Sequence, residues 1–282
     1  MNLPKLPLDV WIDAVVDWLK NNIKPFFDLI STCISSIVSG FDWIFSIVPA
    51  WIMIIVFTVL AFLLSRWTIA LFTFIGFLLI WNLDLWEPTM QTLSLVLTSA
   101  LISIIFGIPI GIACAASKKV QNVVTPVLDF MQTMPAFVYL LPAVIFFRLG
   151  AVPGVIAAVI FAIPPTIRMT NLGIRQVPRH LVEAADAFGS TAMQKLIKLE
   201  LPLAVPTIMA GINQTIMLSL SMVVIASMIG AQGIGEKVLS AVQRLETGKG
   251  FEAGLAIVIL AVVLDRITQS IVNKRSKGSE SH

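Results

Sequence analysis

The stretch from Leu203 to Gly235 contains no ionisable residue, and this absence is the strongest constraint on the fold. A helix at the surface of a soluble protein needs a polar face toward water, whereas about 20 predominantly apolar residues suffice to cross the hydrocarbon core of a bilayer. The same pattern recurs along the chain: 57% of the residues are hydrophobic and only 12% are charged, against about 25% charged residues in soluble domains. The sequence therefore predicts an integral membrane protein.

The apolar stretches predict an all-α, polytopic membrane protein with about seven transmembrane helices, preceded by an amphipathic N-terminal segment. The fourth stretch contains Pro135 and Pro142, which predict either a broken helix that lines a cavity or a merely bent helix. We expect spans at about 49–65, from the turn at 66–67 to 81, and at 89–116, 122–147, 152–170, 203–229 and 252–272.

The N-terminal segment has the pattern of amphipathic helices. In residues 9–21, aspartates at every fourth position form one polar stripe, and the opposite face carries Trp11 and Trp18 among aliphatic residues. This helix is expected either to lie in the membrane interface or to pack against the protein's own membrane helices. Residues 26–47 are only mildly apolar, and we expect a second interfacial helix there, not a span.

The distribution of lysine and arginine predicts the orientation, because cytoplasmic loops of membrane proteins carry an excess of both. With the N-terminus outside and the C-terminus inside, the inner positions are Arg66, Lys118, Lys119, Arg168, Arg175, Arg179, Lys195, Lys198, Lys274, Arg275 and Lys277. The outer positions are fewer: Lys5, Lys20, Lys24, Arg148, Lys237, Arg244 and Lys249. Because the net charge of +3 comes from such flanking positions, it indicates topology and not nucleic-acid binding.

The predicted spans hold little chemistry of their own. Pumps driven by protons or ions carry buried acidic residues or histidines as relays, and here only Asp129 and Asp265 are candidates, both toward cytoplasmic helix ends. The only histidines are His180 and His282, which argues against a histidine metal site or a catalytic triad. We therefore expect a non-enzymatic chain with no cofactor of its own, which receives energy from a partner.

Gly230, Gly233 and Gly235 form a pattern similar to part of a phosphate-binding loop. Such a loop needs a strand before the glycines and Lys-Ser or Lys-Thr after them, and neither is present. The pattern also falls on the predicted external side. We expect a flexible external hairpin here, continued by a polar loop to Gly250.

A charged island, residues 179–202, interrupts the apolar stretches. Its key positions are Glu183, Ala184, Ala185, Gly189, Leu199, Leu201 and Pro202. These residues resemble the EAA loop of the permease subunits of binding-protein-dependent ABC importers, whose pattern is E-A-A-x3-G-x9-I-x-L-P. The only departure is Leu199 in the place of isoleucine.

In that family the loop forms a short coupling helix and a turn that dock in a groove of a cytoplasmic ATPase. The resemblance therefore implies that the charged island couples this chain to two ATPase subunits, which bind ATP and Mg²⁺. It also implies a homodimer of this chain in the lipid bilayer and a separate extracytoplasmic substrate-binding protein.

The physical chemistry of the charged island suits this role. Ala184 and Ala185 permit close approach to a partner, Gly189 permits the turn that ends a short helix, and Pro202 marks the start of the sixth span. The carboxylate of Glu183 is available to a partner or to an arginine one helical turn earlier.

A narrower resemblance indicates the substrate. Gln132–Tyr139 and Pro164–Pro178 are similar to segments of the permeases of glycine betaine, proline betaine and choline importers, and the resemblance covers about residues 85–272. Met134, Phe137 and Tyr139 flank the predicted break, so they are either residues of the translocation path or ordinary packing residues.

We expect an interfacial segment at 1–48, two N-terminal transmembrane helices at 49–84, a permease core at 85–272 with its coupling loop at 179–202, and a cytoplasmic tail at 273–282. The expected function is that of an importer permease for glycine betaine or a related quaternary ammonium osmoprotectant in the bacterial plasma membrane. The alternatives are an ABC permease for choline, carnitine or another small solute, and an ATPase-independent secondary transporter or channel.

Overall fold

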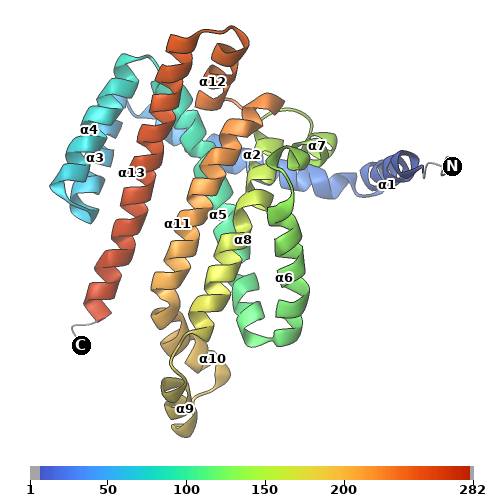
Figure 1. The fold of residues 1–282 in the computed structure, drawn as a ribbon, viewed down its shortest axis with the longest axis vertical. Helices are drawn as coiled ribbons and strands as arrows, with labels where there is room; N and C mark the ends of the chain where they lie inside the picture. Colours follow the sequence, from blue (N-terminus) through green and yellow to red (C-terminus); the bar gives the residue numbers. More distant parts are fainter. Residues whose placement is uncertain (1–6, 280–282) are drawn as a thin grey trace, which may run out of the picture.

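The fold consists of helices alone over residues 7–279, the part of the chain that the computed structural model describes (Figure 1). This confirms the predicted all-α class. The first helices are α1 (Leu8–Asn22), α2 (Lys24–Ile47), α3 (Ala50–Leu64), α4 (Trp67–Asn82), α5 (Trp86–Ala116), α6 (Lys118–Thr133) and α7 (Ala136–Phe147). They are followed by α8 (Ala151–Arg175), α9 (Arg179–Ala187), α10 (Ala192–Lys195), the π-helical turn η1 (Leu196–Glu200), α11 (Leu201–Ala226), the 3₁₀ turn η2 (Ser227–Ile229), α12 (Ile234–Gln243) and α13 (Thr247–Ser279).

Three long helices, α5, α8 and α11, pack against one another and form the centre of the bundle (Figure 1). Glycines lie at their contacts: a Cβ atom added to Gly111 would lie 2.5 Å from Cβ of Thr170, and one added to Gly211 would lie 2.7 Å from Cβ of Met169. In lipid the hydrophobic effect does not drive helices together, so close contact through small residues supplies the association. These glycines therefore set the distance between the central helices.

Some of the buried hydroxyl groups of the central helices are hydrogen-bonded, whereas those of Ser103, Thr170 and Ser219 have no partner among the described residues. Thr215 on α11 donates to the Ala162 carbonyl oxygen at 2.8 Å, and its oxygen lies 2.7 Å from the hydroxyl of Thr166 on α8. Because Thr215 has one proton to give, Thr166 is the donor in the second bond. On α5, Thr98 donates to the carbonyl oxygen of Ser94 at 2.7 Å. Such bonds satisfy polar groups that would otherwise be costly to bury.

The described residues include four helices that are long and apolar enough to cross a membrane: α2, α5, α8 and the continuous helix Ala192–Ile229. The pair α6 and α7 adds a fifth if it forms one span. Helices α3 and α4 are apolar but have only 15 and 16 residues, which extend about 22–24 Å against a hydrocarbon core of about 30 Å. A polytopic membrane architecture is confirmed, whereas the count of seven spans stays a prediction.

The fourth predicted span is broken. Helices α6 and α7 meet at 101° across Met134 and Pro135, so the break is confirmed and the merely bent helix is wrong. That the broken helix lines a cavity stays a prediction. Met134 has φ −73° and ψ 135°, the extended conformation that a following proline imposes. The hydroxyl of Tyr139 donates to the carbonyl oxygen of Met131 across the break. This bond occupies a carbonyl group that the break leaves without a helical partner.

The amphipathic segment forms α1, which projects away from the bundle (Figure 1). Trp11 and Trp18 are 57% and 59% exposed, so α1 does not pack against the protein's own membrane helices, and that alternative is wrong. Figure 1 shows α2 running across one end of the bundle instead of along it, although α2 is long enough to span. The interfacial placement of both helices stays a prediction, and residues 1–6 of this segment lie outside the described residues.

The expected flexible hairpin after Gly230 is wrong. The segment contains α12, whose first residue, Ile234, is fully buried and donates its backbone N–H to the hydroxyl of Thr92 on α5 at 2.8 Å. Gly233 has φ +130°, and a Cβ atom there would lie 2.4 Å from the Thr92 hydroxyl oxygen. The glycine is needed because the chain turns sharply against α5, and α12 then packs on α13.

Helix α13 runs past the predicted seventh span, 252–272, and into the predicted tail at 273–282. It packs against α3, α4, α11 and α12. The last tail residues, 280–282, lie outside the described residues.

Replacing Gly111 by alanine is expected to lower the free energy of unfolding by about 1–3 kcal/mol, because the added methyl group overpacks the contact between α5 and α8. Thermal unfolding of the purified chain in detergent measures this effect. Gly40→Ala in α2 is the matched control, since a Cβ atom there meets nothing within 4 Å. A melting temperature that is the same for Gly111→Ala and the original chain would contradict the close-packing account.

Candidate functional site

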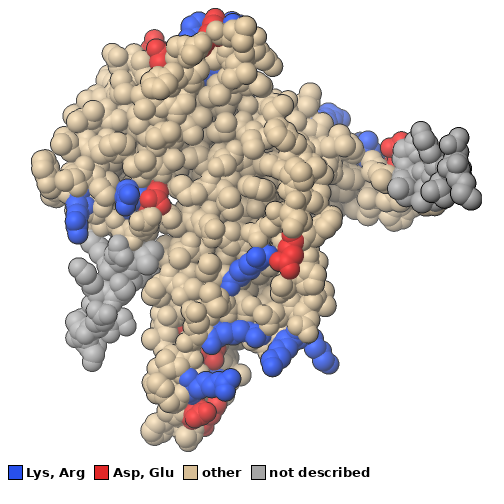
Figure 2. Space-filling view, in the orientation of Figure 1, with Lys and Arg blue, Asp and Glu red and all other residues tan. Residues whose placement is uncertain are grey.

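The charged island projects from the end of the bundle opposite α12, with α9 and α10 at its tip (Figure 1). On the face shown in Figure 2, charged side chains lie around α12, toward the tip, at the left edge at mid-height and on the arm at the right, and a band largely without charge lies below α12. Charged groups are costly in the hydrocarbon core, so a membrane-spanning protein needs such a separation. The tip lies beyond this band, on the side that faces an aqueous compartment.

Gly189 ends α9 with a left-handed turn. Its φ is +77°, its N–H donates to the Asp186 carbonyl oxygen at 2.9 Å, and the Ser190 N–H donates to the Ala185 carbonyl oxygen at 3.0 Å. These two bonds form a Schellman motif, in which glycine avoids the steric penalty that a Cβ atom meets at positive φ. The turn predicted at Gly189 is therefore present.

Side-chain bonds orient α10 against α9. The Thr191 hydroxyl accepts the Gln194 N–H at 3.3 Å, and the Gln194 side chain accepts the Thr191 N–H at 2.9 Å, which makes a capping box. Nζ of Lys195 lies 2.8 Å from Oδ1 of Asp186. Since both side chains of this ion pair are partly exposed, it adds little to global stability. Its effect is to set the direction of the short helix.

The π-helical turn η1 joins the tip to α11 without interrupting the helix, which is continuous from Ala192 to Ile229. Such π-helical turns are rare and occur frequently at functional sites. Helix α11 begins at Leu201 with Pro202 in its first turn, as predicted for the sixth span. Leu196 and Leu201 pack against an apolar cluster formed by α5, α8 and α11. A displacement of the tip is therefore transmitted to the central helices.

The tip carries large apolar side chains that are exposed. Phe188 is 91% exposed, Met193 64% and Ile197 55%. Apolar side chains gathered on a projecting element are typical of a protein interface, and aromatic residues dominate such contacts. The motif pattern of the charged island does not include these three residues. The available signal was Phe188, the only Phe, Tyr or Trp between residues 179 and 202.

The motif residues lie beside this apolar surface. Glu183 and Ala184 are exposed, and Ala185 is half-buried. None of the ion pairs of the described residues joins Glu183 to Arg179, so the Glu183 carboxylate is open to a partner.

A cavity of about 620 Å³ lies beneath the tip, between the ends of α5 and α8 and the segment formed by α10 and η1. Arg175, Lys195 and Glu200 line it together with apolar side chains. Leu199 and Leu201 are half-buried at the base of the island. The tip is thus attached through η1 and has free space below it, so it can move and pass this movement to α11 through η1.

The three candidate path residues are not brought together at one surface. Tyr139 is 5% exposed, with its hydroxyl bonded to Met131 and its ring 6.3 Å from that of Phe161. Met134 is half-buried at the break, and Phe137 is 55% exposed. Tyr139 therefore stabilises the break between α6 and α7. A role of these residues in the translocation path stays a prediction.

The two acidic residues considered as relays both have protein partners. Asp129 on α6 forms an ion pair with Arg168 on α8 at 2.6 Å. Asp265 on α13 accepts hydrogen bonds from Asn213 on α11 at 2.9 Å and from Gln269 at 2.6 Å. Both carboxylates thus join neighbouring helices. The described residues contain no group of three or more His, Cys, Asp or Glu side chains placed to hold a metal ion.

The chain is similar to known transport proteins over nearly its whole length. Residues 107–277 match the family described as binding-protein-dependent transport system inner membrane component. The glycine betaine/carnitine transport permease protein GbuB of Listeria monocytogenes serotype 1/2a (strain 10403S) is 57% identical over 281 residues, which cover 98% of this chain and 99% of that protein. The glycine betaine transport system permease protein OpuAB of Bacillus subtilis (strain 168) is 57% identical over 278 residues, with the same coverage of 98% and 99%.

A solved structure has a similar fold. It shows inward-facing conformations of the MetNI methionine ABC transporter, and one of its chains matches with a TM-score of 0.62 at 21% identity, covering 68% of this chain and 95% of that chain. At this level of identity the similarity establishes the fold alone. It supports the arrangement of the helical bundle described above.

Gly189→Ala is expected to loosen the turn between α9 and α10, because an L-residue in the left-handed conformation loses about 1–2 kcal/mol. Amide hydrogen exchange at residues 186–190 should then be about 5–30 times faster, as measured by mass spectrometry of the full chain. Ser190→Ala is the control, since it changes the adjacent side chain while the residue with positive φ is still Gly189. Equal protection in the Gly189→Ala variant would show that the left-handed turn does not organise the tip.

Proposed function

Because the chain belongs to the family of binding-protein-dependent transport system inner membrane components, we propose that it forms the translocation path of an ATP-driven importer for glycine betaine or a related quaternary ammonium solute. Family membership makes it a multi-pass transport subunit of the inner membrane. The observation that carries the proposed mechanism is the projecting tip, where Glu183, Ala184 and Phe188 are exposed within six consecutive residues.

The proposed partner of the tip is a separate cytoplasmic ATPase that binds ATP and Mg²⁺. Two such subunits serve a homodimer of this chain, and a separate extracytoplasmic binding protein delivers the solute. The C-terminus is then cytoplasmic, which agrees with the lysine and arginine distribution. Figure 1 shows the C-terminal end of α13 directed toward the same end of the molecule as α9 and α10.

Coupling follows from how the tip is attached. The Schellman turn at Gly189 and the bond between Lys195 and Asp186 hold α9 and α10 together as one small unit. The turn η1 connects this unit to α11, which packs along α8 for most of its length. When ATP closes the ATPase pair, the tip moves and tilts α11 and α8, so that the path opens on the other side of the membrane. Directed transport requires that the solute bind the two states with different affinity.

The proposed substrate class rests on the relatives, whose names include glycine betaine at 57% identity. The chemistry of the bundle fits a cargo without net charge. Asp129 and Asp265, the acidic residues of α6 and α13 considered above, are both engaged with protein partners and do not need a cationic cargo for neutralisation. High-affinity capture then belongs to the binding protein.

Carnitine is the second candidate, because the name of the Listeria relative includes it. Choline and other small solutes are further alternatives within the same class of importer. A secondary transporter or channel is the alternative from a different class, and it requires transport without an ATPase.

Phe188→Ser is expected to weaken the association with the ATPase about tenfold or more, because an exposed aromatic residue at the centre of a small interface supplies much of its binding free energy. Co-purification of the complex and its ATP hydrolysis rate measure the effect. The matched control is Phe251→Ser, which removes a 72% exposed phenylalanine in the first turns of α13, at the opposite end. Transport that survives loss of ATPase binding would favour the secondary transporter or channel.

Liposomes that contain the full complex are expected to accumulate labelled glycine betaine only with ATP inside. The extent to which an excess of unlabelled carnitine or choline lowers the uptake of labelled glycine betaine ranks these compounds as substrates. If an excess of unlabelled glycine betaine fails to compete with the transported solute, the betaine assignment is wrong. ATP-dependent uptake of another solute by the same liposomes would leave the importer assignment intact.

A further inference from the structure

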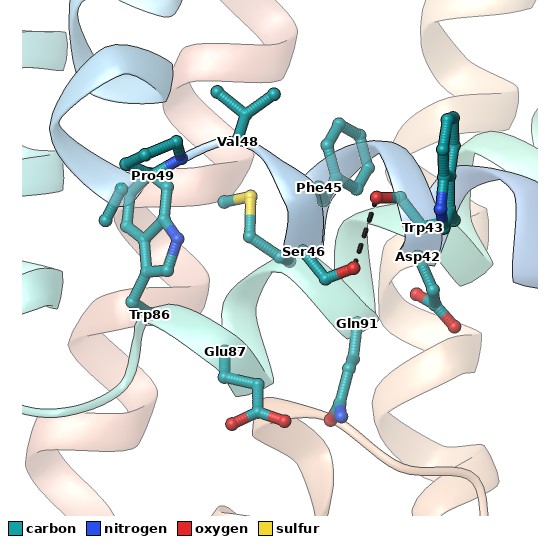
Figure 3. Close-up of a pocket in the computed structure, with 11 residues that line it drawn as sticks. Asp42, Trp43, Phe45, Ser46, Val48, Pro49, Trp86, Glu87 and Gln91 are labelled. Atoms are coloured by element: carbon teal, nitrogen blue, oxygen red, sulfur yellow. Dashed lines mark hydrogen bonds between the residues drawn. The ribbon is translucent and has the colours of Figure 1, made fainter.

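A cavity of about 450 Å³ lies between the C-terminal part of α2 and the first turns of α5 (Figure 3). It is at the end of the molecule that carries α12, far from the charged island (Figure 1). None of its lining residues belongs to the charged island or to the break between α6 and α7. The transport mechanism proposed above leaves this cavity without a role.

Aromatic rings form much of the cavity wall. Trp43, Phe45 and Trp86 line it, and Figure 3 shows the two indole rings on opposite sides. Trp86 meets the ring of Phe77 edge-on, at 5.9 Å between centroids, so its position is supported from behind. Trp43 is 64% exposed and borders the opening. The wall thus offers π-faces, which attract cations.

The charged side chains that line the cavity are both carboxylates, and the neutral polar ones are Ser46 and Gln91. Asp42 and Glu87 line it, and no lysine, arginine or histidine does. Neither carboxylate takes part in the ion pairs of the described residues. Glu87 lies in the first turn of α5, where the helix dipole favours a negative charge, whereas Asp42 has no such support in the C-terminal part of α2.

The polar neighbour of Asp42 uses its hydroxyl proton in a bond to another group. The Ser94 hydroxyl lies close to the Asp42 carboxylate. It donates its proton to the Met90 carbonyl oxygen at 3.0 Å, however. A half-buried carboxylate without a cationic partner gains from any cation that enters the cavity.

We propose that this cavity binds an alkylammonium cation, held between the indole rings of Trp43 and Trp86 and neutralised by Asp42 and Glu87. Its volume falls in the range of about 300–1,000 Å³ that is usual for small-molecule sites. A zwitterion such as glycine betaine binds less well, because its own carboxylate meets Asp42 and Glu87 and no basic side chain. The site therefore differs in specificity from the proposed transport path, and it needs neither ATPase nor binding protein.

The alkylammonium group has two possible sources, a soluble compound of the choline type or the headgroup of a choline or ethanolamine lipid. Val48, Pro49 and Met90 give the cavity an apolar flank, which suits either source. The lipid composition of the nanodisc distinguishes the two sources. Choline binding to the full chain is compared between nanodiscs of phosphatidylglycerol alone and nanodiscs of phosphatidylglycerol with phosphatidylethanolamine. If the ethanolamine lipid suppresses the binding of added choline, the lipid headgroup is the occupant. If choline binds equally in both nanodiscs, the occupant is the soluble cation.

The test is calorimetric titration of the full chain in phosphatidylglycerol nanodiscs with choline chloride, tetramethylammonium chloride, glycine betaine and sodium chloride. We expect saturable binding of choline and tetramethylammonium, and binding of glycine betaine and sodium that is at least about tenfold weaker. Asp42→Asn combined with Glu87→Gln should weaken choline binding about tenfold or more. Trp43→Leu, at an exposed position that folding does not require, should weaken it as well.

Asp84→Asn is the matched control, because Asp84 is an exposed carboxylate on the neighbouring turn and does not line the cavity. It should leave choline binding unchanged, and unfolding temperatures equal to that of the original chain show that the variants are folded. The proposal is overturned if choline does not bind, if the double variant binds it equally well, or if glycine betaine binds as tightly. None of these outcomes bears on ATP-dependent uptake, so failure here is distinct from failure of the proposed transport function.

Discussion

Close contact between α5, α8 and α11 is the constraint on which the rest of the structure depends. In a bilayer, lipid chains are as apolar as leucine, so helices associate through tight packing and hydrogen bonds and not through the hydrophobic effect. Gly107 and Gly111 allow α8 to approach α5 closely, and Gly211 allows α8 to approach α11 closely. The buried bond between Thr166 and Thr215 joins the same helices. A larger side chain at any of these glycines would separate the central helices.

This packing also determines the position of the tip. The charged island begins where α8 ends and finishes where α11 starts, and Gly173 on α8 lies against Ala204 on α11. The two ends of the island are therefore held side by side, and its helices can only project outward. The same contact allows the island to transmit movement, because a force applied at α9 acts on two helices that cannot move independently. The cavity lined by Asp42, Trp43, Trp86 and Glu87 lies at the other end of the bundle and has no residue in common with the island.

Much of this could be predicted from local sequence, and the failures share one cause. The long apolar helices and the turn at Gly189 follow from residue types within a few positions of one another, whereas Pro135 left open whether the fourth helix breaks or bends. The segment after Gly230 was predicted wrongly because Ile234 is buried by a contact with Thr92, 142 residues away in the chain. The exposure of Phe188 was not predicted, because exposure depends on the whole fold. An aromatic residue in a charged segment can be either buried or exposed.

The sequence by itself determined the class of the protein: the uncharged stretches require a membrane, and the spacing of Glu183, Ala184, Ala185 and Gly189 indicates the transport family. Hydropathy and turn preference act within one or two helical turns, so they can be recognised without a structure. Only the tertiary structure decided which side chains are hidden and which are displayed. Tyr139 and Phe137 are two positions apart, yet one closes a break inside the bundle and the other is exposed, because burial depends on the helices that pack nearby.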